Sequence, residues 1–260
     1  MISPITLRTR IASGNAILDI RHIKRDFRMG AETVHALRGV SFSVFKGEFV
    51  TIMGASGSGK TTLLNTLGCM DRPTSGEYIL DGEPTHKLKN DERSILRNRK
   101  IGFVFQNFNL LPRTSALEQV ELPLLYNSEI SVKERRARAM TCLEKVGLAH
   151  RFGHFPNQLS GGQQQRVAIA RALVNDPVMI LADEATGNLD TRTSYEIMAL
   201  FQNLNRANKT IVFVTHEQDI ATFSSRTLKL KDGLLHSDYK NENIANAAKA
   251  LAELPIPKDG

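Results

Sequence analysis

The stretch Phe49-Val50-Thr51-Ile52-Met53-Gly54-Ala55-Ser56-Gly57-Ser58-Gly59-Lys60-Thr61 decides how this chain folds. Residues 49–53 form a nearly continuous apolar run, as expected of a buried parallel strand. Residues 54–61 match G-x-x-x-x-G-K-[ST], a phosphate-binding loop, and a helix is predicted from there through Leu67. A strand, a glycine-rich loop and a helix in this order predict an α/β fold that binds a nucleoside triphosphate.

The residue types of this loop fit the chemistry of phosphate binding. The glycines let successive backbone N–H groups face the β-phosphate, and the helix N-terminus adds about half a positive charge. Lys60 is expected to neutralise phosphate oxygens, and the Thr61 hydroxyl is expected to bind Mg²⁺. A chance glycine loop is the alternative, but the flanking strand and helix argue against it. The predicted nucleotide-binding residues here are Gly54, Ala55, Ser56, Gly57, Ser58, Gly59, Lys60, Thr61 and Thr62.

Two acidic residues end an apolar run later in the chain, where Met179–Ala182 lead into Asp183 and Glu184. Asp183 at the strand end is expected to hold the Mg²⁺ shell. Glu184, one step further, is placed to polarise an attacking water. Acids at a strand end are often simple caps, so this interpretation depends on the phosphate-binding loop.

Two further polar residues follow predicted strands. The carboxamide of Gln106 can bind the attacking water or Mg²⁺, although a solvated loop glutamine is the simpler explanation from local sequence. His216 can donate to the γ-phosphate, although a lone histidine at a strand end is usually structural. Ligands bind beyond the carboxyl ends of parallel strands, which favours the functional interpretation of His216.

An aromatic ring upstream is a candidate for contact with adenine. Phe27 lies in a stretch expected to be loop-like, residues 25–30, and its ring can stack on the base. Val34 can add an apolar contact. Packing in the core explains either residue equally well.

A second glycine-rich turn, Leu159-Ser160-Gly161-Gly162-Gln163, opens another predicted helix. The Ser160 hydroxyl and the free N–H groups of the two glycines form an anion site at a helix start. Lys60 already holds the phosphates of its own chain, so this turn is expected to bind the γ-phosphate held by a second copy. The sequence therefore predicts a homodimer that closes on ATP and relaxes after hydrolysis.

Predicted strands flank a mostly helical middle of the chain. The strands are expected at 17–23, 40–45, 49–53, 77–80, 101–105, 178–182, 210–215 and 227–230. Helices are expected from an Asn90 N-cap to Arg99, at Ser115 with Glu118 in a capping box, at 132–146 before Gly147, from Ser160, and up to Arg206. We therefore predict an extension (1–16), an α/β domain (17–240) with a helical subdomain (about 90–174), and a C-terminal helix (241–254) with a tail to 260.

Composition excludes several classes of protein. The 260 residues, 41% of them hydrophobic and 23% charged, suffice for a globular core. No apolar run approaches the roughly 18–20 residues of a membrane span. The basic N-terminal stretch lacks the apolar region of a signal peptide, so a short disordered extension is expected. Two cysteines, Cys69 and Cys142, are too few for a disulfide framework, which favours buried thiols and a cytosolic protein.

The net charge of +7 does not by itself indicate a nucleic-acid partner. Basic residues gather at 87–100 and 133–138, but Asp91, Glu92 and Glu134 interrupt both runs. No aromatic residues interleave with them, so a stacking platform for bases is missing. A solvated helical face explains these runs, and contact with an anionic lipid surface is the alternative.

Together these motifs resemble the ATP-binding subunits of ABC transporters, over about Ile17 to His236. In that family's terms, residues 54–61 look like Walker A, Gln106 the Q-loop, 159–163 the signature, Asp183-Glu184 Walker B with the catalytic glutamate, 187–190 the D-loop and His216 the switch histidine. The resemblance implies a P-loop ATPase with an antiparallel β subdomain and an inserted helical subdomain. It also implies ATP and Mg²⁺ as cofactors. The implied site residues are catalytic Glu184, His216 and Gln106, nucleotide-side Ser160, Gly161, Gly162, Gln163 and Asp190, and the Mg²⁺ ligands Thr61, Gln106 and Asp183.

Four longer strings, at 52–60, 71–76, 105–112 and 182–190, resemble the MacB/LolD branch of that family. This branch serves macrolide and peptide efflux and lipoprotein release. Ala185 stands where the branch usually has proline, and Phe27 replaces a commoner tyrosine. Neither departure removes a side chain that is expected to bind ATP or Mg²⁺.

The resemblance implies an ATPase subunit at the cytoplasmic face of the inner membrane, below two copies of an integral-membrane permease. A groove around residues 106–112 is expected to receive a permease helix, a periplasmic adaptor is left open, and no nucleic acid is expected. One alternative is a cell-division-type ATPase that drives a membrane partner without transport. A soluble protein acting on ribosomes or DNA is disfavoured by the single cassette and the absence of heptads. Cargo, direction and the identity of the permease lie outside what this sequence encodes, because the cargo touches the permease.

Overall fold

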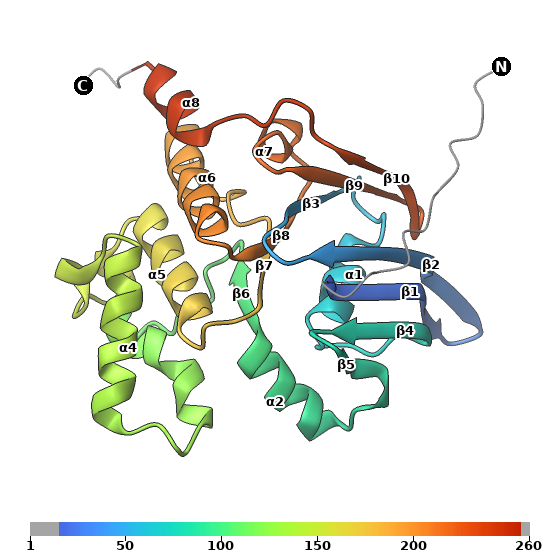
Figure 1. Ribbon diagram of the computed structural model, residues 1–260, viewed down its shortest axis with the longest axis horizontal. Helices are drawn as coiled ribbons and strands as arrows, with labels where there is room; N and C mark the ends of the chain where they lie inside the picture. Colours follow the sequence, from blue (N-terminus) through green and yellow to red (C-terminus); the bar gives the residue numbers. More distant parts are fainter. Residues whose placement is uncertain (1–15, 256–260) are drawn as a thin grey trace.

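The structure, a computed structural model, describes residues 16–255 and is built from two sheets with helices packed around them (Figure 1). Residues 1–15 of the predicted extension and 256–260 of the predicted tail lie outside the described residues. A six-stranded sheet has the order β10-β9-β3-β8-β7-β6 and a four-stranded sheet the order β2-β1-β4-β5. The strands are β1 (Ala16–Met29), β2 (Glu32–Phe45), β3 (Phe49–Met53), β4 (Ser75–Leu80), β5 (Glu83–Pro84), β6 (Ile101–Phe105), β7 (Met179–Asp183), β8 (Thr210–Thr215), β9 (Arg226–Lys231) and β10 (Leu234–Lys240).

Parallel pairing joins five strands of the larger sheet, and β10 pairs with β9 antiparallel. Every residue of β3 and β8 is buried, which explains their nearly continuous apolar sequences. Alternate residues of β8 serve opposite faces: Ile211 and Phe213 join one core, and Val212 and Val214 join the other. The sheet is thus the shared wall between two hydrophobic cores.

Helices cover one face of this sheet, and the four-stranded sheet with α1 covers the other (Figure 1). The helical side is formed by α3 to α6 and α8, whose buried residues join the first core. The helices are α1 (Lys60–Leu67), α2 (Asn90–Lys100), α3 (Ala116–Glu121), α4 (Val132–Lys145), α5 (Gly161–Leu173), α6 (Thr191–Arg206), α7 (Gln218–Ala221) and α8 (Ala247–Glu253). The boundaries of the domain (17–240) and of the helical subdomain (about 90–174) stay predictions.

Several local predictions are confirmed. The strands at 49–53, 101–105 and 210–215 have the predicted bounds. Ser115 caps α3, and its backbone N–H donates to Oε2 of Glu118 at 2.8 Å. Gly147 ends α4 with φ +75°, a left-handed conformation that favours glycine. Both cysteines are buried and free.

Other predictions are wrong. Residues 25–29 are not a loop but the end of β1, because the turn at Gly30 pairs them with β2. The C-terminal helix begins at Ala247 rather than 241, because Asn246 caps it and the Asn241 amide donates instead to the carbonyls of Ala221 and Ser224. The N-cap of α2 is Lys89, whose N–H donates to Glu92 at 2.7 Å, not Asn90. Strand β10 was not predicted, because its polar sequence lacks apolar alternation.

Gly102 allows β6 and α5 to approach closely. A Cβ added at Gly102 would lie 2.3 Å from the carbonyl oxygen of Ala172 on α5. Because the nearest atoms belong to the backbone of Ala172, no flexible side chain could move aside to make room for a methyl group.

We predict that Gly102→Ala lowers the free energy of unfolding by about 1–3 kcal/mol, because the extra methyl forces helix and strand apart. Urea denaturation measures this. Gly153→Ala is the matched control: an added Cβ there has no atom within 4 Å, so a change within about 0.5 kcal/mol is expected. Equal effects at the two positions would contradict the close-approach argument.

Candidate nucleotide-binding site

A cleft of about 1020 Å³ lies where the parallel strands end. It is lined by the loop after β3, by residues that follow β6, β7 and β8, and by two segments of the β-rich side. The lining residues are Val34, His35, Ala36, Arg38, Ala55, Ser56, Gly57, Gly59, Lys60, Thr61, Thr62, Gln106, Asp183, Glu184, His216, Asp232 and Gly233. Parallel pairing therefore brings together most of the residues predicted for one nucleotide site.

The loop after β3 has the backbone that its glycines were expected to permit. Gly57 and Gly59 have φ of +79° and +101°. Lys60 begins α1, and its ammonium donates to the carbonyl oxygens of Gly54 at 2.7 Å and Ala55 at 3.0 Å. A cationic group and a helix N-terminus thus meet at the cleft, which is the arrangement that binds phosphate. Ser58 is buried rather than cleft-lining, and its side chain packs under Gly54.

Glu184 and His216 form a hydrogen-bonded pair in the cleft, with Oε1 and Nδ1 2.9 Å apart. Glu184 has φ +44°, which a residue with a side chain rarely adopts. Its N–H donates to Val214 at 2.8 Å and its carbonyl accepts from Gly187 at 2.9 Å, so both sides of this strained residue are fixed. Strain maintained in this way is typical of functional positions.

Asp183 lies at the end of β7 beside Glu184. Burial raises the pKa of the Asp183 carboxyl, the negative charge of Glu184 raises it further, and the ammonium of Lys60 opposes both. A cation beside this carboxylate would therefore offset the free-energy cost of burying its negative charge.

Gln106 lines the cleft, but its amide is bound elsewhere. Nε2 of Gln106 donates to Oδ1 of Asn188 at 3.1 Å, and the Asn188 amide donates to Oδ1 of Asn107 at 2.8 Å. No local feature of the sequence indicates this contact, since the partners are 82 residues apart.

Phe27 and Val34 face each other across the β1–β2 hairpin, and only Val34 lines the cleft. The guanidinium of Arg25 lies 4.3 Å from the centroid of the Phe27 ring and covers one of its faces. Neither residue is in the core: Phe27 is 37% and Val34 47% exposed. His35 and Arg38, which were not predicted, are in the cleft because β2 runs beside it.

The second glycine turn is not part of this cleft. Ser160 caps α5, its Oγ accepting from the N–H of Gln163, and the Gln163 side chain accepts from the N–H of Ser160 at 3.0 Å. Asp190 caps α6 in the same way, and hydrogen bonds from Thr193 hold its pKa below the usual range. Ser160, Gly161, Gly162, Gln163 and Asp190 thus lie apart from the phosphate-binding loop of their own chain.

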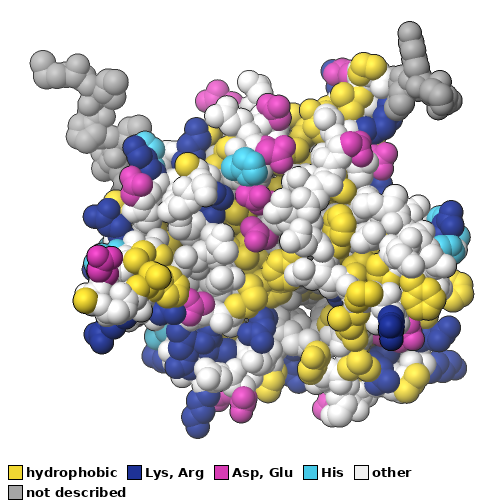
Figure 2. Space-filling model, turned by 180° about the vertical axis from the view of Figure 1, so that it is seen from behind, with side chains coloured by type: hydrophobic (Ala, Val, Ile, Leu, Met, Phe, Trp, Pro, Cys, Tyr) yellow, Lys and Arg dark blue, Asp and Glu magenta, His cyan; other side chains and the backbone are white. Residues whose placement is uncertain are grey.

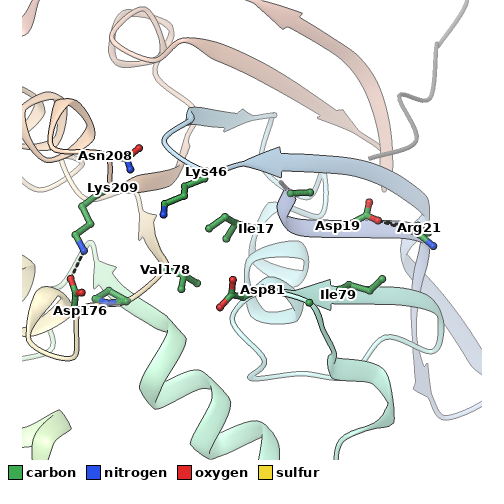
Figure 3. A pocket seen from close by; sticks show the side chains of 13 residues that line it. Ile17, Asp19, Arg21, Lys46, Ile79, Asp81, Asp176, Val178, Asn208 and Lys209 are labelled. Atoms are coloured by element: carbon green, nitrogen blue, oxygen red, sulfur yellow. Dashed lines mark hydrogen bonds and ion pairs between the residues drawn. The ribbon is translucent and has the colours of Figure 1, made fainter. Parts of the chain in front are cut away.

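A second cavity, of about 790 Å³, lies beside the amino ends of β7 and β8 (Figure 3). Ion pairs between Lys209 and Asp176 and between Arg21 and Asp19 neutralise much of the charge around it (Figure 3). Ligands of parallel sheets bind at the carboxyl ends of the strands, so the first cleft is the candidate site.

Residues 37–187 match the protein family described as ABC transporter. The chain belongs to that family. It is an ATP-binding subunit and an ATPase, as predicted. An uncharacterized ABC transporter ATP-binding protein of Thermotoga maritima is 54% identical over 217 residues, covering 84% of this chain and 92% of the relative. The macrolide export protein MacB of Syntrophobacter fumaroxidans is 50% identical, but this ABC subunit spans only 31% of its length.

The predicted P-loop fold is also confirmed by solved structures. A dimeric post-hydrolysis state of the ATP-binding cassette MJ0796 bound to ADP and Pi is similar, with a TM-score of 0.79 and 48% identity. The match covers 86% of this ABC subunit and 99% of that cassette. MJ0796 is a protein of Methanocaldococcus jannaschii. Between residues 16 and 255, no helix of this subunit is long and apolar enough to cross a bilayer.

We predict that Asp183→Asn raises the thermal stability of the protein at neutral pH without Mg²⁺ or nucleotide. The pKa of Asp183 is raised by folding, so its contribution to stability is full below the unfolded value of about 3.9 and is lost as pH rises through the folded value. Asparagine mimics the protonated acid, so the advantage should vanish near pH 3. Melting curves across pH measure this, and the lowered pKa of Asp190 predicts no such gain for Asp190→Asn. A pH-independent gain at Asp183 would contradict the electrostatic explanation.

Proposed function

We propose that this chain forms a homodimer on ATP and drives an integral-membrane permease from the cytoplasmic face of the inner membrane. One observation carries the proposal: the Ser160–Gln163 turn is a capped helix start that lies outside the cleft of its own chain. A second copy can bring this turn to the phosphates. The dimeric structures of MJ0796, one of them bound to ADP and Pi, support the homodimer.

In this proposal, the pair of Glu184 and His216 carries the chemistry. Glu184 orients the attacking water, and His216, 2.9 Å away, contacts the γ-phosphate. Lys60 and Ser160 of the second copy stabilise the charge that develops. Val34 and the uncovered face of the Phe27 ring are the proposed contacts of adenine.

Thr61, Asp183 and Gln106 are the proposed ligands of Mg²⁺. No group of three or more metal-binding His, Cys, Asp or Glu side chains occurs among residues 16–255. This fits Mg²⁺, which is commonly held by one or two carboxylates together with substrate phosphates. When bound, the ion would supply positive charge that neutralises phosphate oxygens of the nucleotide. For Gln106 to bind the ion, its side chain must first release the hydrogen bond to Asn188.

We propose that a permease helix binds in a groove beside Gln106, the Q-loop residue. A cavity of about 270 Å³ is lined by Phe103, Phe105, Asn109, Pro123 and Arg171, among others. The exposed large hydrophobic residues of the described chain include Leu111, Leu125 and Tyr126. A band of hydrophobic side chains also crosses the face seen in Figure 2.

We propose that the subunit powers export or lipoprotein release, which the macrolide export relatives support, and that a periplasmic adaptor is a further partner. A cell-division-type ATPase without transport is the alternative.

We predict that Glu184→Gln lowers kcat for ATP hydrolysis by about 10²–10⁴-fold, because the carboxylate that orients water is lost. ATP binding should be retained, since the phosphate-binding loop is unchanged. Phosphate release and binding of a fluorescent ATP analogue measure the two properties. Lys60→Ala is the control that should lose ATP binding itself. Undiminished hydrolysis in Glu184→Gln would remove the proposed role of this residue.

A pull-down tests the membrane partner. Tagged Glu184→Gln protein with ATP is incubated with detergent-solubilised native membranes, and the captured proteins are identified by mass spectrometry. A permease with a large extracytoplasmic domain is the expected result, and its sequence would separate transport from cell-division-type work. Capture of ribosomal or DNA-bound proteins without any membrane protein would contradict the proposal.

A further inference from the structure

The segment after Gln106 has a backbone conformation that bulky residues avoid. Phe108 and Asn109 are consecutive residues with positive φ, +59° and +50°. Asparagine tolerates this left-handed region, but phenylalanine rarely adopts it. Such a conformation persists only where the surroundings hold it.

Arg171, on α5, provides this hold. Its Nη2 donates to the carbonyl oxygen of Phe108 at 2.9 Å and its Nη1 to that of Asn109 at 2.6 Å. Burial lowers the pKa of Arg171, and no acid of the described residues offsets that effect. The Arg171 side chain is half-buried and is held by these two carbonyl contacts.

The ring of Phe108 reaches the other end of the same helix. A Cβ at Gly161, the first residue of α5, would lie 3.7 Å from Cζ of Phe108. Gly161 and Arg171 are separated by about 15 Å along the helix axis. The carbonyl of Phe108 is therefore bound near the end of α5, while its ring lies close to the start of the same helix, beside Leu189.

A second side chain of α5 fixes the start of this loop. Gln165 is fully buried, and its Nε2 donates to Ala185 at 2.6 Å and more weakly to Phe105 at 3.4 Å. The strand end before Gln106 and the turn after Glu184 are thus tied to the same helix.

We propose that Arg171 is a positioning residue for the Ser160–Gly162 turn and acts through Phe108. The guanidinium keeps Phe108 in the left-handed conformation, and the ring then holds the turn at the angle needed to meet the nucleotide of a second copy. This inference rests on the proposed ATP-driven homodimer. Arg171 itself does not contact the nucleotide in this proposal.

The test measures dimerisation and ATP binding separately. In the Glu184→Gln background, sedimentation velocity with ATP gives the dimer dissociation constant, and a fluorescent ATP analogue at low protein concentration gives the affinity of the monomer. Arg171→Met removes both donors at similar side-chain length. It should weaken dimerisation about tenfold or more and leave monomer affinity within about twofold. Arg171→Lys, with one compact donor group, should fall between.

Phe108→Gly supplies the second arm, because glycine accepts positive φ and removes only the ring. It should weaken dimerisation as Arg171→Met does, and it decides the question if Arg171→Met fails to fold. Arg138→Met is the matched control, an exposed arginine on α4 that pairs with Glu134 and does not touch the loop. Dimerisation of Phe108→Gly at the background concentration would overturn the inference. Failure of Glu184→Gln itself to dimerise would overturn the proposed function and this inference with it.

Discussion

The register of the parallel strands is the constraint on which the site depends. Met53 lies opposite Thr215, Val214 opposite Asp183, and Asp183 opposite Phe105. The next residues along each strand therefore emerge side by side, and these are the phosphate-binding loop, His216, Glu184 and Gln106. Buried strands cannot slip by one residue without turning their apolar side chains to the wrong face. The two hydrophobic cores thus set the catalytic geometry.

The site retains several features that do not favour stability. Glu184 and Phe108 adopt left-handed backbone, and the carboxylate of Asp183 is desolvated beside another acid. The two left-handed residues are held by neighbours rather than by their own preference: Glu184 by Val214 and Gly187, and Phe108 by Phe105 and Arg171. Residues maintained against their own tendencies are pre-organised, so less rearrangement is needed when substrate binds.

Local signals carried much of the fold and most of the candidate site. The buried strands, the glycine loop and the Ser115 and Ser160 caps are specified by neighbouring residues, and the structure has them where expected. The errors lie where distant partners override local preference. The apparent loop at 25–29 becomes strand by pairing with β2, and the last helix begins only at Ala247, after Asn241 has bound the carbonyls of Ala221 and Ser224. The contact of Gln106 with Asn188 likewise joins residues that are far apart in the chain. The proposed contact of the Ser160 turn with the nucleotide of a second copy also depends on a partner outside the chain itself.

The close approach at Gly102 has a mechanical consequence. The close approach of Gly102 to Ala172 sets the distance between β6 and α5 near the C-terminal end of the helix, so this contact is the natural pivot for any change in the angle of α5. Gly161, the first residue of α5, lies about 17 Å from this pivot along the helix axis. A tilt of about 5° would therefore carry the Ser160 turn through roughly 1.5 Å while leaving the pivot in place. The residues proposed to meet the second copy therefore lie at the end of α5 where a change in the angle of the helix displaces them most.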